Sequence, residues 1–189
     1  MSDRLLTKEE LIQLSKKSER DAAKALSFLA KKQVEVKTAS AELVEDFSSE
    51  RFLRDIGEDS IVAYTELLTG LDGMSLLTLT REDALDIVDL FNGRYPGTTT
   101  TLKEIDRSTI RESINIISNS YATTLACSLK KTILLSVPRI ITKSILVDIF
   151  KKQAWDSSNS VAFFKTVLRI AEVDYQVHIY FFFLNKQEN

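Results

Sequence analysis

The sequence is poor in the residues that most often mark a chemical site. It contains one cysteine and one histidine in 189 residues. A single cysteine excludes an intrachain disulfide, which fits a reducing compartment, and the apolar neighbours of Cys127 predict a small buried side chain. A single histidine excludes a zinc site of the His-rich kind, and it excludes any Ser-His-Asp triad that does not use His178.

Glycine and long apolar runs are also scarce. The five glycines form neither a Walker motif nor a dinucleotide-binding motif. No run of about eighteen apolar residues occurs, and the first residues lack the apolar stretch of a signal peptide, so we expect no membrane insertion. A net charge of −2 gives no general reason to expect nucleic-acid binding. We therefore expect a cytoplasmic chain.

Segments with helical and strand periodicity alternate along the sequence. Capping boxes at 7–10 and 80–83 predict helices over 7–31 and 80–92, and a third helix is expected over 102–129. Strands are expected at 33–44, 60–69, 71–80, 130–137, 140–150, 160–173 and 174–184. These elements predict an α+β fold of two layers, in which six or so mostly antiparallel strands form a sheet with long helices packed on it.

The two halves of the sequence resemble each other at an offset of 99 residues. Residues 22–36 and 121–135 share an alanine, a leucine and a pair of lysines ahead of a strand. We expect a single domain, residues 1–189, with a pseudo-twofold arrangement of two helix–strand–hairpin repeats. The repeats cover about 7–93 and 102–185 and are joined by a connector at 94–101.

The 102–129 helix carries two opposite stripes. Ser108, Glu112, Asn115 and Asn119 follow one another at i, i+4, i+7 and i+11, so they share one polar face. Isoleucines, a tyrosine and a leucine form the apolar stripe, at positions 110, 114, 117, 121 and 125. A polar face of this kind is usually only solvated. The position of Pro138, with 22 residues between it and Asn115, indicates a more specific role.

The pattern formed by Ser108, Glu112, Asn115 and Pro138 resembles the motif of the CheC and CheX phosphatases of chemotaxis, in the CheC/CheX/FliY superfamily. The resemblance implies a hydrolase that removes the phosphoryl group from the phosphoaspartate of CheY and so ends or adapts the signal. Asn115 would position the attacking water and Glu112 would pair with a cation on the partner, with Ser108 and Pro138 in supporting places. The resemblance implies no cofactor of the chain's own, because the response regulator supplies Mg²⁺.

The first repeat does not preserve this motif. Its corresponding positions hold Glu9, Gln13, Lys16 and Ala39, so the acid, the asparagine and the proline are all replaced. The chain therefore resembles a CheC with one intact site rather than CheX, which keeps a single helix pair. A switch component of the FliY type is less favoured, because such chains carry a further C-terminal domain and this sequence ends at residue 189.

A non-catalytic role is the alternative. CheC-like chains bind CheD and response regulators, and a chain with one degenerate motif fits an adapter that binds either of them. In that interpretation the 81–92 helix is a candidate docking surface.

Overall fold

The computed structural model describes residues 6–45, 47–153, 160–171 and 175–185. The helices are α1 (Lys8–Ala30), α2 (Ser49–Leu53), α3 (Arg81–Phe91), α4 (Glu104–Leu129) and α5 (Lys143–Lys152). The strands are β1 (Val34–Val44), β2 (Ile61–Leu67), β3 (Gly73–Leu79), β4 (Arg139–Ile141), β5 (Ser160–Ile170) and β6 (Tyr175–Asn185). The expected α+β class is confirmed.

Within these ranges the strands form one open sheet, and every neighbouring pair is antiparallel. The strand order is β1-β5-β6-β3-β2-β4. The chain runs through helix, strand, shorter helix and two paired strands, adds α3, and then repeats the first order from α4 to β6. Exchanging each strand of one half for its counterpart in the other leaves the order the same, so the fold is pseudo-twofold about the β6–β3 pair. The division of the domain into pseudo-repeats at about 7–93 and 102–185 stays a prediction.

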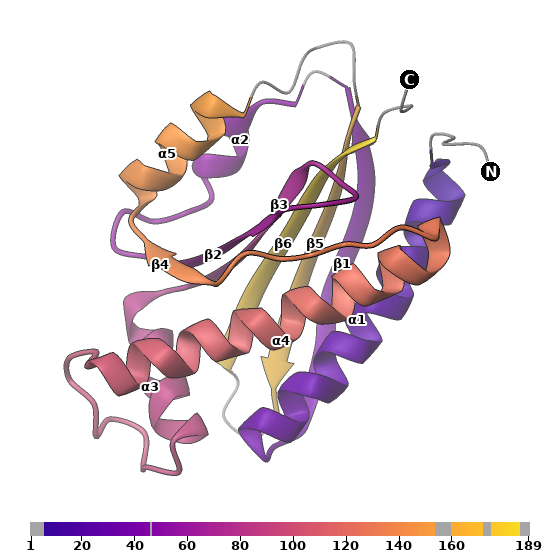
Figure 1. The fold of residues 1–189 in the computed structure, drawn as a ribbon. Helices are drawn as coiled ribbons and strands as arrows, with labels where there is room; N and C mark the ends of the chain where they lie inside the picture. The colour runs from indigo at the N-terminus through magenta and orange to yellow at the C-terminus, as the bar shows by residue number, and fades with distance from the viewer. Residues whose placement is uncertain (1–5, 46, 154–159, 172–174, 186–189) are drawn as a thin grey trace.

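The two faces of the sheet are covered by different helices, as Figure 1 shows. The long helices α1 and α4, with α3, pack on one face in a core that includes Leu26 and Ile114. The short helices α2 and α5 lie on the opposite face, where Phe52 and Phe150 are buried. No helix in the described ranges combines the length and the apolar character that crossing a membrane requires.

The very apolar strand β6 supplies side chains to both cores. Its run of aromatic residues predicts an interior strand, and the structure confirms this by placing β6 between β5 and β3. Successive side chains of a strand point to opposite faces. Phe181 and Phe183 therefore enter the core beneath the long helices, while Tyr180 and Phe182 enter the core beneath the short ones.

Local contacts and backbone turns set where the long helices begin and end: a capping box starts α1, and a left-handed lysine follows both α1 and α4. The expected capping box of α1 is present, because Glu10 N donates to Thr7 Oγ1 over 3.3 Å and Thr7 N donates to Glu10 Oε2 over 3.0 Å. At their C-termini, α1 and α4 are each followed by a lysine in the left-handed region, Lys31 at φ 51° and Lys130 at φ 55°. These equivalent turns send the chain back toward the sheet.

The edge strand β1 is irregular. It pairs with β5 along its length, but the register shifts between Val36 and Thr38, which marks a β-bulge. Lys37, inside the bulge, is exposed. The expected hairpins are also present: β2 pairs with β3 around a turn near residues 68–72, and β5 pairs with β6. Part of the expected turn between β5 and β6 lies outside the described residues.

Two strand predictions are wrong. Residues 130–134 form no strand, and a single bridge between Leu67 and Leu135 replaces a ladder there. The predicted strand at 140–150 is mostly the helix α5, and only its first two residues belong to β4. The run of β-branched residues favours a strand, but Thr142 accepts a hydrogen bond from Ile145 N and caps a helix instead. Leu146 and Phe150, one turn apart, then point into the core.

The prediction for Cys127 is wrong as well. Its side chain is exposed, because it continues the outward stripe of α4 that includes Asn119 and Thr123 at intervals of four residues. Apolar sequence neighbours do not bury a residue when the helix turns it away from the sheet.

Candidate functional site on helix α4

The two stripes of α4 lie on the faces that their spacing predicts. Ile114, Ile117 and Tyr121 are fully buried against the sheet and α1. On the opposite face Ser108 and Glu112 are exposed, and Asn115 is half-buried. An acid and a carboxamide one turn apart are therefore presented together from a rigid helix, and the fixed backbone limits where both groups can reach.

Helix geometry explains the long interval before Pro138. From Glu112 to Leu129 the helix advances by roughly 26 Å, and an extended chain from 130 to 138 covers about the same length. After the turn at Lys130 the chain does run back along α4 to β4, which contacts that helix. Pro138 thus returns to about the level of Glu112 along the helix, where it is half-buried directly before β4.

The returning segment is held against β2. Leu68 N donates to Leu134 O over 2.7 Å, and Ser136 N donates to Glu66 O over 2.8 Å. The side chain of Thr65 adds a hydrogen bond to Ser136 O over 2.8 Å. These bonds precede Pro138, and the pairing of β4 with β2 follows it, so the chain is fixed on both sides of the proline. Pro138 lies before β4 rather than at the end of the predicted 130–137 strand.

Glu112 makes no ion pair with any residue in the described ranges. The neighbouring cation, Arg111, is instead paired with Glu104 about two turns earlier on the same helix. The carboxylate of Glu112 is thus exposed and available to a cation on another molecule.

Asn115 has one side-chain neighbour on its own helix. Asn119 Nδ2 donates to Asn115 O over 2.8 Å and to Asn115 Oδ1 over 3.1 Å. An amide oxygen has two lone pairs, so Asn115 Oδ1 retains acceptor capacity after this contact. The stripe therefore combines a free acid with an oriented carboxamide.

A buried charged cluster fixes the start of α4. Asp89 in α3 and Asp106 in α4 are 0% and 1% exposed, and Arg94 in the connector bridges them with contacts of 3.3 Å and 2.6 Å. Thr99 N donates to Asp89 Oδ2 over 2.8 Å, and Lys103 N donates to Asp106 Oδ2 over 2.9 Å. The connector, which shows no sequence periodicity, is therefore tied to both helices.

The carboxyls of this cluster predict how the stability of the fold changes at acid pH. Burial acts to raise the pKa of the Asp89 and Asp106 carboxyls, but hydrogen bonds, from Thr99 to Asp89 and from Arg94 and Lys103 to Asp106, together with the Arg94 charge, lower both below the ordinary value of 3.8. A carboxyl with a lowered folded-state pKa stabilises the fold fully above the unfolded-state pKa and loses that contribution as the pH falls through the folded-state pKa.

We expect the free energy of unfolding to decrease below about pH 4 and to keep decreasing as both groups are protonated. Urea denaturation between about pH 2 and pH 6 measures this. The Asp89→Asn/Asp106→Asn variant, which has no carboxyl to protonate at these positions, should show a shallower decrease over that interval. An equally steep decrease in the variant would assign the acid sensitivity to other groups.

The first-half positions lie on a different surface. Glu9, Gln13 and Lys16 are exposed on α1, and Ala39 is exposed in β1. Lys16 and Ala39 line an open groove of about 660 Å³ between these two elements. Both positions thus border one groove, and they hold a cation and a methyl group instead of the carboxamide and the proline of the second half.

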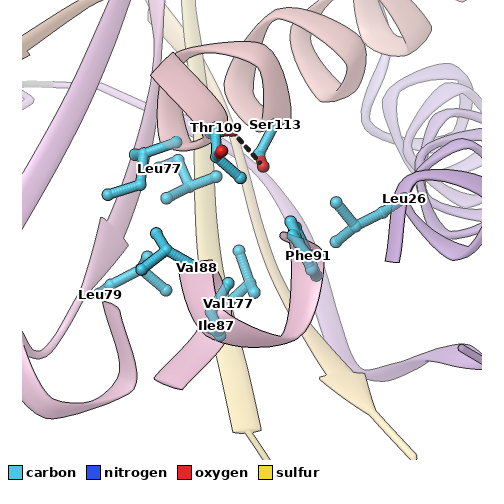
Figure 2. Close-up of a pocket in the computed structure, with 10 residues that line it drawn as sticks. Leu26, Leu77, Leu79, Ile87, Val88, Phe91, Thr109, Ser113 and Val177 are labelled. Carbon is cyan, nitrogen blue, oxygen red and sulfur yellow. Dashed lines mark hydrogen bonds between the residues drawn. The ribbon is translucent and has the colours of Figure 1, made fainter. Parts of the chain in front are cut away.

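A second cavity is a packing gap rather than a site. It measures about 10 Å³ and lies where α3 and α4 meet the sheet, lined almost entirely by apolar side chains such as Leu77, Val88 and Val177. Figure 2 shows Ser113 at its edge, where the hydroxyl donates to Thr109 O over 2.9 Å. A volume near that of one water-sized probe holds no ligand. The described residues also contain no group of three or more His, Cys, Asp or Glu side chains placed to hold a metal ion.

Comparison with known proteins places the fold. No protein-family model matches the chain. FliY from Thermotoga maritima is similar with a TM-score of 0.67 and 24% identity, over 94% of this chain and 90% of that one. A chain of the CheX–CheY–BeF₃–Mg²⁺ complex from Borrelia burgdorferi is similar with a TM-score of 0.59 and 13% identity, over 93% of this chain and 98% of that one. A chain of the FliG–FliM complex from H. pylori is similar with a TM-score of 0.66 and 11% identity, over 93% of this chain and 94% of that one.

The chain therefore has the fold of the CheC/CheX/FliY type, which the FliM middle domain shares. The resemblance that the motif indicates is confirmed at the level of the fold. Proteins of this fold have different functions, so the activity has to be argued from the site.

Proposed function

We propose that the chain is a chemotaxis phosphatase that hydrolyses the phosphoaspartate of a response regulator of the CheY type. The observation that carries the proposal is the exposed stripe of α4, where Glu112 forms no ion pair with the residues that the structure describes and Asn115 lies one turn away. The CheX structure with CheY, BeF₃ and Mg²⁺ supports the choice of partner, since it is a complex between a protein of this fold and a response regulator.

The proposed reaction requires the phosphatase to position a water molecule and involves no covalent intermediate on it. Water attacks phosphorus in line, the bond from phosphorus to the aspartyl oxygen breaks, and inorganic phosphate and a free carboxylate leave, with the proton of water passing to phosphate or solvent. In this proposal Mg²⁺ belongs to the regulator. Asn115 Oδ1 accepts a hydrogen bond from the attacking water and so fixes its direction.

Glu112 has a separate role in the proposal. A carboxylate aimed at the phosphoryl group would repel it, so Glu112 is better placed to pair with a lysine of the regulator near the phosphorylated aspartate. Its own helix leaves it unpaired, and an exposed acid can form that contact without first breaking another.

The test is phosphate release from a CheY-type regulator that has been phosphorylated with acetyl phosphate. We expect the chain to accelerate release over the regulator's own rate, and the Glu112→Ala/Asn115→Ala variant to lose the acceleration. A purified chain that binds the regulator but does not accelerate release would overturn the proposal.

Glu112→Ala alone should act mainly on binding. We expect KM for the phosphorylated regulator to rise about tenfold while kcat stays within about threefold, because a contact made equally in the ground and transition states affects KM. Steady-state phosphate release over a range of regulator concentrations measures both constants. Glu9→Ala, at an exposed first-half position, is the control. A loss confined to kcat would contradict this division of roles.

A non-catalytic adapter is the second candidate function. It is favoured by the FliG–FliM complex, in which a protein of this fold is part of a switch assembly, and by the changed first-half positions. The exposed side of α3 is then the candidate docking surface, with CheD or a regulator as the partner. Pull-down of CheD together with an absence of phosphate release would favour this function.

A further inference from the structure

The stripe of α4 contains one residue beyond the four-position motif that contacts Asn115. Asn119 is exposed one turn further along the helix, and its amide nitrogen lies 2.8 Å from Asn115 O and 3.1 Å from Asn115 Oδ1. The first of these contacts folds the Asn119 side chain back along the helix. The second joins it to the carboxamide of Asn115.

This contact decides which way the Asn115 carboxamide faces. The terminal torsion of an asparagine side chain is broad, so an unrestrained carboxamide exchanges the directions of its oxygen and its nitrogen readily. A donor at Asn119 attracts Asn115 Oδ1 and would leave Nδ2 without an acceptor if the amide turned over. One lone pair of Oδ1 is used in this contact and the other stays available.

The matching positions of α1 offer an internal comparison. An offset of 99 residues takes Asn115 to Lys16 and Asn119 to Arg20. Arg20 Nε also folds back along its helix and donates to Lys16 O over 3.0 Å. The backbone contact is thus kept in both helices, but the carboxamide pair exists only where the four-position motif is intact.

We propose that Asn119 is a positioning residue, which holds the Asn115 carboxamide so that the second lone pair of Oδ1 receives the attacking water. This inference rests on the proposed phosphatase function. Asn119 itself touches neither the water nor the phosphoryl group, so its removal affects the rate of the chemical step through the orientation of Asn115.

The experiment compares Asn119→Ala, Asn119→Gln and the control Thr123→Ala, an exposed residue one turn further along the same helix. We expect Asn119→Ala to lower kcat for phosphate release about fivefold to tenfold with KM within about twofold of wild type. Asn119→Gln keeps a carboxamide donor and should recover kcat to within about twofold of wild type. Thr123→Ala should leave both constants unchanged.

A second measurement separates this inference from the proposed function. The NMR order parameter of the Asn115 side-chain amide should be that of a rigid group in the wild type and fall below about 0.6 in Asn119→Ala. An unchanged kcat, a loss confined to KM, or an equally mobile amide in both proteins would overturn the positioning role. If the wild type releases no phosphate, the proposed function and the catalytic role fail together, while NMR still decides whether the contact exists.

Discussion

Asn115→Ala should reduce kcat for phosphate release at least about 100-fold while the phosphorylated regulator still binds. The alanine removes the only carboxamide of the intact motif, and loss of a group that orients the reacting water commonly lowers a rate by about two orders of magnitude. Among the other side chains of the motif, Glu112 would bring a negative charge toward the phosphoryl group, and Pro138 has no hydrogen-bonding group. The neutral hydroxyl of Ser108 lies about two turns of helix before Asn115.

Lys16→Ala is the matched control for this variant. Lys16 occupies the equivalent position on α1 and is exposed, so its replacement should leave kcat unchanged if only the second half is catalytic. Thermal unfolding should place both variants close to the wild type, because neither side chain lies in the core. An Asn115→Ala protein with wild-type kcat would contradict the water-positioning mechanism even if the chain proved to be a phosphatase.

Asp106→Ala should lower the free energy of unfolding far more than substitutions at the exposed positions of α4. The carboxylate is 1% exposed, accepts from Lys103 N at the first turn of α4, and lies 2.6 Å from Arg94. Its removal leaves the helix cap unmade and Asp89 as the only buried carboxylate beside Arg94. We expect the free energy of unfolding to fall by roughly 2 to 4 kcal/mol, as removal of a buried, hydrogen-bonded charge typically causes.

Urea denaturation measures this loss, and Glu104→Ala is the control. Glu104 lies in the same first turn and also pairs with an arginine, but its side chain is 77% exposed. Exposed ion pairs contribute little, so we expect a change below about 0.5 kcal/mol. Equal effects of the two substitutions would show that the buried cluster does not anchor the helix.

The parts of the fold that the sequence predicts are those set by local patterns. The stripes of α4 depend on residue spacing, the interior position of β6 depends on its run of aromatic residues, and the structure confirms both. The 140–150 segment fails because its β-branched residues satisfy a strand and a helix equally, and the cap at Thr142 decides. The Thr142 hydroxyl favours a helix start, whereas the run of apolar residues that follows fits either structure.

The parts of the site that the sequence does not predict depend on contacts between separate elements. Nothing in the sequence around Asp89, Arg94 and Asp106 pairs them with one another, and their pairing follows only from how α3 meets α4. The contact between Asn119 and Asn115 can be partly predicted from the sequence, because side chains four residues apart are neighbours on a helix. Spacing alone does not show that Asn119 donates to the Asn115 carboxamide rather than to solvent.

The irregular edge strand β1 also affects how the molecule behaves at high concentration. An eleven-residue edge with unpaired backbone groups is a template on which a neighbouring chain can add a strand. The bulge at Val36–Thr38 breaks the even spacing of those groups, and exposed Lys37 adds a charge at the break. The opposite edge, β4, is only three residues long. Both edges of the sheet therefore resist edge-to-edge aggregation.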